Sequence, residues 1–475
     1  MKSFYGCLNN YRFTNERIWT SIAAFPPPTD APQGHPVRRN DRPDHPPPSP
    51  ATDAPPERVA LRLGEARLLG LRRRGVSRFG GLRYALAPVG ARRFAPPAPL
   101  PLRGEVDATG TGPIAPQLPS ALAPVLGACE APQSEDCLHL TVWTPGADAA
   151  RRPVLVWCHG GAWQSGGVLD WYSGEALARR GDVVVVGLNA RLGPLGWLLA
   201  DGGVANLGLL DLELAFQWVA THIAAFGGDP ARITAMGQSA GGVNVAALGM
   251  RGASGFQRAI LQSAPLGRGA RSAEAARFIG RTLLRAAGAA DLRQARDLPV
   301  ERLLRAQLAP EVVAATRAAA DGHGLFGPVL DGDTLPPLSA PLTAHAAGRV
   351  DVLAGWNRDE MRAFAAPGAA VNEAETERRF ATPARQWAAQ SARAGAQAWL
   401  YRFDGPPGLP LGACHCAELP FVFGTHGAFA SAPLLAGLHP ADGQRLTQQM
   451  QAAWLDFVHG RPLPWAPGPQ PQVFA

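Results

Sequence analysis

The chain has almost no lysine and no long run of apolar residues. Among its 475 residues Lys2 is the only lysine, so the net charge of +7 rests on arginine. Arginine runs such as Arg72 to Arg74 lack interleaved aromatic residues, so we expect a solvated surface and no nucleic-acid partner. No stretch approaches the ~20 apolar residues of a membrane span. The first residues also lack the apolar segment of a secretory signal, so we expect a cytoplasmic protein.

Paired cysteines are also missing. The six cysteines are Cys7, Cys129, Cys137, Cys158, Cys414 and Cys416. None forms a CxxC pair or another spacing typical of metal sites. Cys414 and Cys416 flank His415, but neighbouring side chains of an extended chain point to opposite faces and do not readily converge on one ion. We therefore expect neither a metal nor a cofactor.

The N-terminal segment differs from the rest of the chain. Residues 26–56 are dense in proline and poor in apolar residues. Such a segment buries too little surface to offset the entropy lost on ordering. We therefore predict that residues 1–57 are disordered, with a misassigned start site as the alternative, and that residues 58–475 form one domain.

Beyond residue 58, short apolar runs alternate with helical stretches. The clearest predicted strands are Pro153–Cys158, Asp182–Asn189, Ile233–Gly237, Arg258–Gln262, Val350–Ala354 and Ala396–Phe403. The clearest predicted helices are Leu209–Ala224, Ala240–Met250 and Ala273–Ala287. This alternation predicts an α/β fold with a mostly parallel sheet and helices on both faces. Several strands end in loops with polar residues of catalytic type, at the edge where such sheets hold their sites.

Residues 237–242 read GQSAGG and lie between a predicted strand and a predicted helix. A sharp strand-to-helix turn strains the serine backbone and exposes its hydroxyl above the sheet. Ser239 is therefore the candidate nucleophile. The alternative is a glycine-rich turn that happens to contain a serine, since the motif alone is a weak signal.

A second glycine-rich loop supplies candidate oxyanion donors. Residues 159–163, HGGAW, directly follow the predicted strand Pro153–Cys158. Such a loop can turn its backbone N–H groups toward one point, and the N–H of Ala240 completes the set. We expect His159 to hold this loop rather than to act in catalysis.

Several blocks together resemble the type-B carboxylesterase family, which includes the cholinesterases and para-nitrobenzyl esterases. They are GVSRFGGLRYALAPVGARRFAPP (75–97), SEDCLHLTVWTP (134–145), HGGAW (159–163), NARLGPLGW (189–197) and NLGLLDLELAFQWVATHIAAFGGDP (206–230), followed by GQSAGG. The resemblance covers most of residues 60–465. It implies an α/β-hydrolase fold and a Ser-His-Glu triad.

The resemblance also implies roles for particular residues. Glu360 matches the family's acid in the N-x-D-E loop, and its neighbour Asp359 is expected to face away. His415 matches the base within G-x-x-H-x-x-E-L-P, ahead of the weaker candidates His222, His323 and His426. The chain order, with the serine first and the histidine last, is that of an α/β-hydrolase.

The same comparison implies three oxyanion donors, the N–H groups of Gly161, Ala162 and Ala240. Ala162 stands where many members have glycine, and a methyl group there should be tolerated because the donor is the backbone. Ser263 resembles a serine that supports the acid; an ordinary serine at the end of a strand is the alternative.

Two departures from the family pattern stand out. Only 55 positions separate Glu360 from His415, which is short for the family. We expect a more open and less selective site, with impaired placement of His415 as the alternative. The cysteine that pairs with Cys137 in secreted relatives is missing, because Ile114 and Ala115 occupy that stretch, in keeping with a reducing compartment.

These observations predict a serine carboxylesterase that acts on a small-molecule ester without metal or cofactor. Two alternatives stay open: a family member with a binding role and little activity, and an amidase or carbamate hydrolase with the same triad. The natural ester and the oligomeric state are not predicted.

Overall fold

The computed structural model describes residues 55–252, 255–319, 322–336, 348–365 and 369–475. Residues 1–54 lie outside these ranges, so the disorder expected for residues 1–57 stays a prediction. The first strand, β1, begins at Glu57, one residue before the predicted start of the domain.

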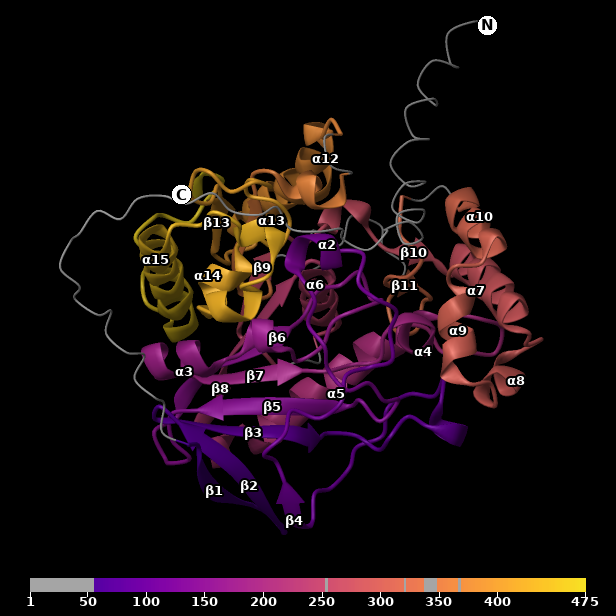
Figure 1. The fold of residues 1–475 in the computed structure, drawn as a ribbon, viewed down its shortest axis with the longest axis horizontal. Coiled ribbons are helices and arrows are strands. Elements are labelled where there is room, and N and C mark those ends of the chain that lie inside the picture. Colours follow the sequence, from indigo (N-terminus) through magenta and orange to yellow (C-terminus); the bar gives the residue numbers. More distant parts are fainter. Residues whose placement is uncertain (1–54, 253–254, 320–321, 337–347, 366–368) are drawn as a thin grey trace, which may run out of the picture.

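One large sheet runs through the part of the chain that the structure describes (Figure 1). Its twelve strands among these residues are β1 (Glu57–Leu63), β2 (Ala66–Arg73), β3 (Val76–Arg83), β4 (Gly104–Asp107), β5 (His139–Thr144), β6 (Arg152–Cys158), β7 (Val184–Leu188), β8 (Gly228–Gln238), β9 (Arg258–Gln262), β12 (Asp351–Asn357), β13 (Ala398–Phe403) and β14 (Pro471–Phe474). The strand order is β1-β2-β3-β5-β7-β6-β8-β9-β12-β13-β14, with β4 beside β2. The pairs from β1 to β7 in this order are antiparallel, and those from β7 to β14 are parallel.

Helices cover both faces of this sheet. Val154 and Val156 of β6 belong to one buried cluster, and Leu155 and Trp157 belong to another. Successive side chains of a strand point to opposite faces, so the two clusters are the two cores. The first core is closed by α5 (Leu207–His222), α6 (Ala240–Arg251) and α13 (Thr382–Arg393), and the second by α3 (Glu175–Gly181), α14 (Leu419–Phe423) and α15 (Pro440–His459).

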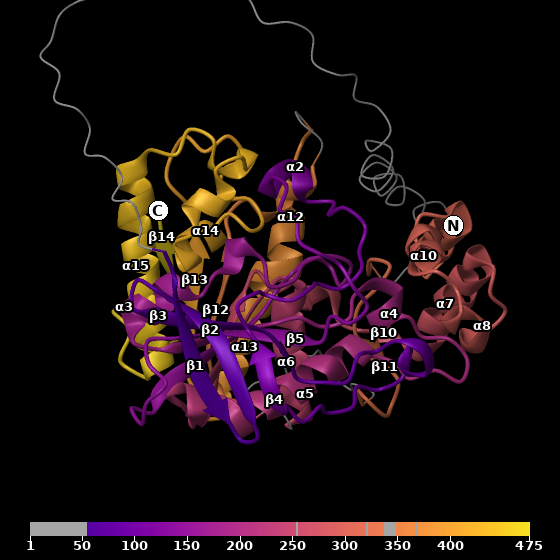
Figure 2. The same cartoon turned by 60° about the horizontal axis from the view of Figure 1, so that its bottom comes forward.

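Four further helices form a group at one end of the molecule, at the side opposite α15 (Figures 1 and 2). They are α7 (Ala273–Ala287), α8 (Leu292–Arg296), α9 (Val300–Ala306) and α10 (Pro310–Ala318). The Ser272 side chain caps α7 by accepting from the N–H of Ala275, which stabilises the helix start. No helix among the described residues combines the length and apolar character needed to cross a membrane.

The remaining short elements lie around these layers. They are α2 (Ala123–Leu126), α4 (Gly193–Trp197), α12 (Glu373–Thr376) and the strand pair β10 (Arg271–Ser272) and β11 (Val329–Leu330), with the 3₁₀ turns η3 (Gly90–Arg92), η4 (Asp170–Tyr172), η5 (Ile223–Phe226), η6 (Leu266–Arg268), η7 (Glu360–Phe364), η9 (His426–Phe429) and η10 (Pro433–Leu435) and the π-helical turn η8 (Glu377–Ala381). Figure 1 places α12 and α2 above the strands.

The predicted strands and helices are confirmed, and β9 and α7 keep their predicted bounds. Strands β1 to β5 were not among the clearest predictions. Arginines and glycines interrupt several of them, as in β2, ARLLGLRR, so these strands lack the continuous apolar signal of a strand buried on both faces. β5, HLTVWT, is buried throughout but short and flanked by loops.

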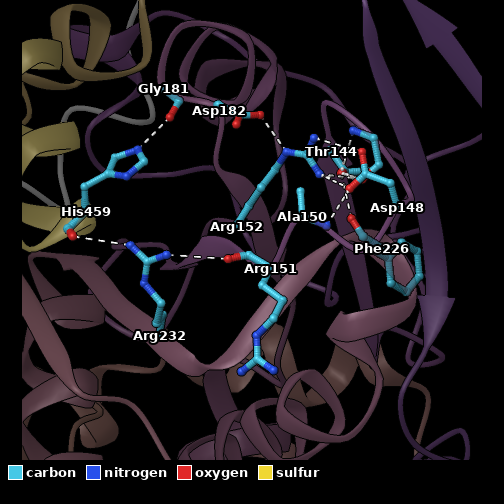
Figure 3. Close-up of polar contacts among 11 residues, drawn as sticks. Thr144, Asp148, Ala150, Arg151, Arg152, Gly181, Asp182, Phe226, Arg232 and His459 are labelled. Carbon is cyan, nitrogen blue, oxygen red and sulfur yellow. Dashed lines mark hydrogen bonds and ion pairs between the residues drawn. The ribbon is translucent and has the colours of Figure 1, made fainter.

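A polar network ties together the edge of the sheet where β6 begins (Figure 3). Arg152 contacts Asp148 at 2.5 Å and Asp182 at 2.6 Å. Nearby, the ring of His459 at the end of α15 donates to the carbonyl oxygen of Gly181 at 2.7 Å. These contacts fasten α15 and the loop before β7 at the edge opposite the strand ends that carry Ser239 and Glu360.

Candidate active site

Ser239 lies at the sharp turn from β8 into α6. Its backbone has φ 53° and ψ −124°, a region that non-glycine residues adopt only where the surroundings hold them. Its N–H donates to the carbonyl oxygen of Gln262 on neighbouring β9 at 2.9 Å. Close packing also needs Gly241, because a Cβ there would lie 2.0 Å from the carbonyl oxygen of Cys158. The turn presents a partly exposed Ser239 at the carboxyl ends of the central strands.

Glu360 and His415 meet in a buried hydrogen bond. Glu360 begins η7, just after β12, and His415 lies in the loop between β13 and α14. The ring Nδ1 of His415 is 2.5 Å from Oε2 of Glu360. The other carboxylate oxygen accepts from the N–H of Asn357 at 2.9 Å. With the proton on Nδ1 toward Glu360, a neutral His415 presents Nε2 as a hydrogen-bond acceptor.

The rival acid Asp359 points elsewhere. Its Oδ2 accepts from the N–H of Ala413 at 2.9 Å and pairs with Arg358 at 3.0 Å. The short segment between positions 360 and 415 thus brings the histidine to Glu360 and leaves Asp359 to hold the loop that carries it.

Gln238 faces the other nitrogen of the histidine. Its Nε2 lies 3.2 Å from Nε2 of His415 and 3.2 Å from Sγ of Cys416. Among the described residues no hydrogen bond joins Ser239 Oγ to His415. Catalytic hydrogen bonds often tighten only when substrate binds. Sequence reasoning did not single out Gln238, although it stands immediately before the serine in GQSAGG.

Two aromatic rings enclose the histidine. The ring centroids of Phe364 in η7 and Phe380 in η8 lie 5.1 Å and 5.5 Å from that of His415. The N–H of Thr382 bonds to the carbonyl oxygen of Glu377, five residues back, as in a π-helix, and such turns are frequent at functional sites. The π-helical turn therefore places an aromatic side chain beside His415.

The loop after β6 offers unused backbone donors. Gly161 has φ 111° and Ala162 has φ 54°. None of the hydrogen bonds among the described residues uses the N–H of either one. A Cβ on Gly161 would lie 1.9 Å from the carbonyl oxygen of Ser165, so the loop excludes a side chain there. Ala240, the first residue of α6, has no acceptor within its own helix.

His159 packs within this loop. Its Nδ1 lies 2.7 Å from the carbonyl oxygen of Gly160, and burial lowers the pKa of its ring below the usual value. This local contact agrees with the expected structural role. A cavity of about 20 Å³ borders His159, Gly160 and Ala240, and such a volume holds roughly one water molecule.

A second buried carboxyl group lies behind the Glu360–His415 pair. Glu418 accepts from Nδ2 of Asn357 at 2.7 Å and from Nε2 of Gln262 at 3.2 Å. Burial, together with the nearby charge of Glu360, raises its pKa to about 7. Sequence reasoning missed these three residues, although Asn357 and Glu418 belong to the two motifs that carry Glu360 and His415.

Ser263 lies at the end of β9 with φ 44°. Its N–H donates to the carbonyl oxygen of Gly355 at 2.9 Å. Its buried Oγ has no hydrogen-bond partner among the described residues. The structure therefore does not join it to Glu360, and its supporting role stays a prediction.

No group of three or more potential metal ligands gathers in the part of the chain that the structure describes. The Nδ1 of His415 already bonds Glu360, and the Cys416 thiol lies against the Gln238 amide. Cys414 is a buried free thiol, and burial raises its pKa to about 12, whereas a metal ligand must be a thiolate.

The sequence model of the carboxylesterase family matches residues 57–378. The chain belongs to this family. It is 40% identical over 414 residues to a probable N-octanoylanthranilate hydrolase of Rhodococcus erythropolis, covering 81% of this chain and 89% of that protein. It is 34% identical to the phenmedipham hydrolase of Pseudarthrobacter oxydans (81% and 86% covered) and 35% identical to the para-nitrobenzyl esterase of Bacillus subtilis (82% and 87% covered).

Solved carboxylesterase structures share the fold. A thermophilic para-nitrobenzyl esterase matches with a TM-score of 0.75 and 31% identity, covering 84% of this chain and 90% of that one. A carboxylesterase of Geobacillus stearothermophilus matches with a TM-score of 0.73 and 33% identity, covering 87% and 96%. The predicted α/β-hydrolase fold and family are confirmed, and this carboxylesterase family member is a carboxylic ester hydrolase.

Proposed function

We propose that this protein hydrolyses short to medium carboxylic esters through an acyl-enzyme intermediate on Ser239. The observation that carries the proposal is the 2.5 Å contact between His415 Nδ1 and Glu360 Oε2 beside the strained nucleophile turn. A serine hydroxyl needs a base, and the base needs a group that fixes its tautomer. The three side chains supply these parts in that order.

In the proposed mechanism Ser239 Oγ attacks the ester carbonyl carbon while Nε2 of His415 takes the hydroxyl proton. Glu360 stabilises the imidazolium that forms. The N–H groups of Gly161, Ala162 and Ala240 bind the oxyanion. Collapse of this intermediate breaks the bond to the alcohol, which leaves with the proton from His415. A water molecule then releases the acid by the same steps and restores Ser239.

The test is the hydrolysis of p-nitrophenyl butyrate by Ser239→Ala. Loss of the nucleophile should reduce kcat/KM by roughly 10³-fold or more. Ser431→Ala, an exposed serine, is the matched control and should keep the wild-type rate. Wild-type activity in Ser239→Ala would show that another group performs the attack.

Covalent labelling separates an esterase from a family member that only binds. A p-nitrophenyl alkylphosphonate should add one phosphonyl group to Ser239, read by mass spectrometry of the peptide that carries it. A wild-type protein that neither reacts with the phosphonate nor hydrolyses the ester would support the binding role.

Cleavage of an N-acyl bond by the same triad is the second candidate. The Rhodococcus relative is named for an N-acyl substrate, and the proposed acyl-enzyme chemistry applies to esters and amides alike. Measuring kcat/KM for octanoyl p-nitroanilide against p-nitrophenyl octanoate decides between them. A preference for the anilide would favour an amidase.

A further inference from the structure

Arg268, at the end of η6, is half-buried and forms no ion pair among the described residues. Its Nε is fully buried and makes no hydrogen bond among the described residues. No carboxylate in the described ranges lies within ion-pair distance of its guanidinium. A buried N–H group without a partner is unfavourable, so this side chain needs an explanation.

Two further arginines and one glutamate lie near Arg268. Arg378 and Arg379 of η8 both bond the carboxylate of Glu375, the first at 2.8 Å, and these contacts lower the Glu375 pKa to about 2. The single negative charge of Glu375 is thus already shared by two arginines. Burial and these two arginines lower the pKa of Arg268 to about 10, so it stays charged at neutral pH. Arg268 thus lies near two further arginines and near one carboxylate that both of them already bond.

The cluster of Arg268, Glu375, Arg378 and Arg379 borders the active site through η6 and through η8. The backbones of η6 and η8 touch, since a Cβ on Gly267 would lie 2.0 Å from the carbonyl oxygen of Arg378. Two residues further along η8, the Phe380 ring lies 5.5 Å from that of His415. Before η6, Ala264 packs against the first turn of α6, where a Cβ on Gly242 would lie 2.7 Å from that of Ala264. Arg268 therefore lies between the neighbours of the nucleophile and those of the base.

We propose that Arg268 binds a carboxylate carried by the substrate, so that the preferred esters are anionic. This inference rests on the proposed esterase function and names its substrate class. The guanidinium offers a planar set of N–H donors that matches a carboxylate in a bidentate pair. Such a partner would bond the terminal nitrogens of the half-buried Arg268 and add a negative charge beside the three arginines. The carboxylate would lie several bonds from the ester carbonyl, since η6 flanks the reacting residues and does not contain one.

The test compares a charged ester with its neutral counterpart. The p-nitrophenyl half-esters of adipic and suberic acid carry the carboxylate, and the same compounds capped as methyl esters do not. Wild-type protein should show the higher kcat/KM for the half-esters. Arg268→Met should reduce kcat/KM for the half-esters by roughly 10- to 100-fold, the range for a lost hydrogen bond to a charged group. Turnover of the capped esters should change less than about threefold.

Controls separate this inference from the esterase proposal. Arg281→Met removes an exposed arginine of α7 that pairs with Asp201, and it should leave the half-ester preference unchanged. Equal losses for charged and capped esters in Arg268→Met, or no preference in wild type, would overturn the anion site. Turnover of the capped esters by wild type measures the esterase function independently.

A binding measurement gives a readout that does not need turnover. The adipate dianion should raise the Tm of wild type and of Arg281→Met, and not that of Arg268→Met. Arg268→Lys keeps the charge but loses the bidentate geometry, so it should retain part of the shift. If adipate stabilised all four proteins equally, its binding would lie elsewhere and the proposal would fail.

Discussion

Gln238 shapes the surroundings of the base from the position next to the nucleophile. Its side-chain amide lies 3.2 Å from His415 Nε2 and carries no net charge. A carboxylate at the same place would favour the imidazolium form of the ring. A charge introduced at residue 238 would therefore act directly on the proposed base.

Gln238→Glu should move the acid limb of the kcat/KM profile to higher pH by about one unit or more, the usual effect of an adjacent opposite charge. The measurement is hydrolysis of p-nitrophenyl butyrate from pH 5 to 9. Gln238→Met has a similar volume and no charge, so its acid limb should move far less. Coincident profiles for the two variants would show that charge at this position does not act on the base.

At the residue scale, the sequence predicted the candidate catalytic residues better than it predicted which residues contact one another. Ser239, Glu360 and His415 follow from motifs, and the structure places the last two in contact. The partners of Glu418 did not follow, because Gln262 lies 156 positions away and Asn357 lies 61 positions away. Such pairs depend on strand order, which one sequence does not reveal.

At the scale of elements, the loop after β6 combines two neighbouring residues with opposite tolerance for a side chain. Gly161 has no space for a Cβ, whereas Ala162 holds its methyl group at φ 54°. A left-handed backbone strains an alanine by about 1–2 kcal/mol, and a glycine would remove this strain. The glycine would also lower the free energy of unfolding by about 0.4–1 kcal/mol, because its unfolded chain has greater conformational freedom. The two effects largely cancel at Ala162.

Gly161→Ala should therefore displace the loop and lower kcat by about 10²-fold or more, the effect of losing one oxyanion donor. Ala162→Gly is the matched change and should keep kcat near wild type, with an unfolding free energy within about 1 kcal/mol of it. Rates and urea unfolding curves for both variants provide the check. A large loss in Ala162→Gly alone would reverse the assignment of the constrained position.

The sequence also predicted elements unevenly. The parallel strands were found because they are buried on both faces and read as apolar runs, such as VVVGL in β7. Strands β1 to β4 carry exposed residues and a mixed pattern, as in ERVALRL of β1. They are joined to the rest of the sheet only through the pairing of β3 with β5, so local sequence alone gave little sign of them.

At the scale of the whole molecule, the buried carboxyl group of Glu418 links stability to pH. Its pKa is about 7 in the folded protein and about 4.3 in an unfolded chain. A raised pKa means that the folded state binds the proton more tightly. The stabilisation is therefore complete below about pH 4 and is lost as the pH rises through 7.

Glu418→Gln removes this titration while keeping the side-chain shape. Between pH 5 and 8, wild type should lose more unfolding free energy than the variant does, by an amount on the order of 3 kcal/mol. Urea midpoints at the two pH values measure the difference. Equal pH dependence in both proteins would mean that Glu418 is ionised throughout.

The π-helical turn η8 limits changes in chain length as well as in composition. Its hydrogen bond spans five residues, so the turn holds one residue more than an α-helical turn. Deleting one residue would allow a regular helix and rotate everything before it by about 100° relative to α13. Arg378, Arg379 and Phe380 would then lose their present places together. A substitution would change one of these side chains, whereas a single deletion would separate both the aromatic ring and the arginines from His415.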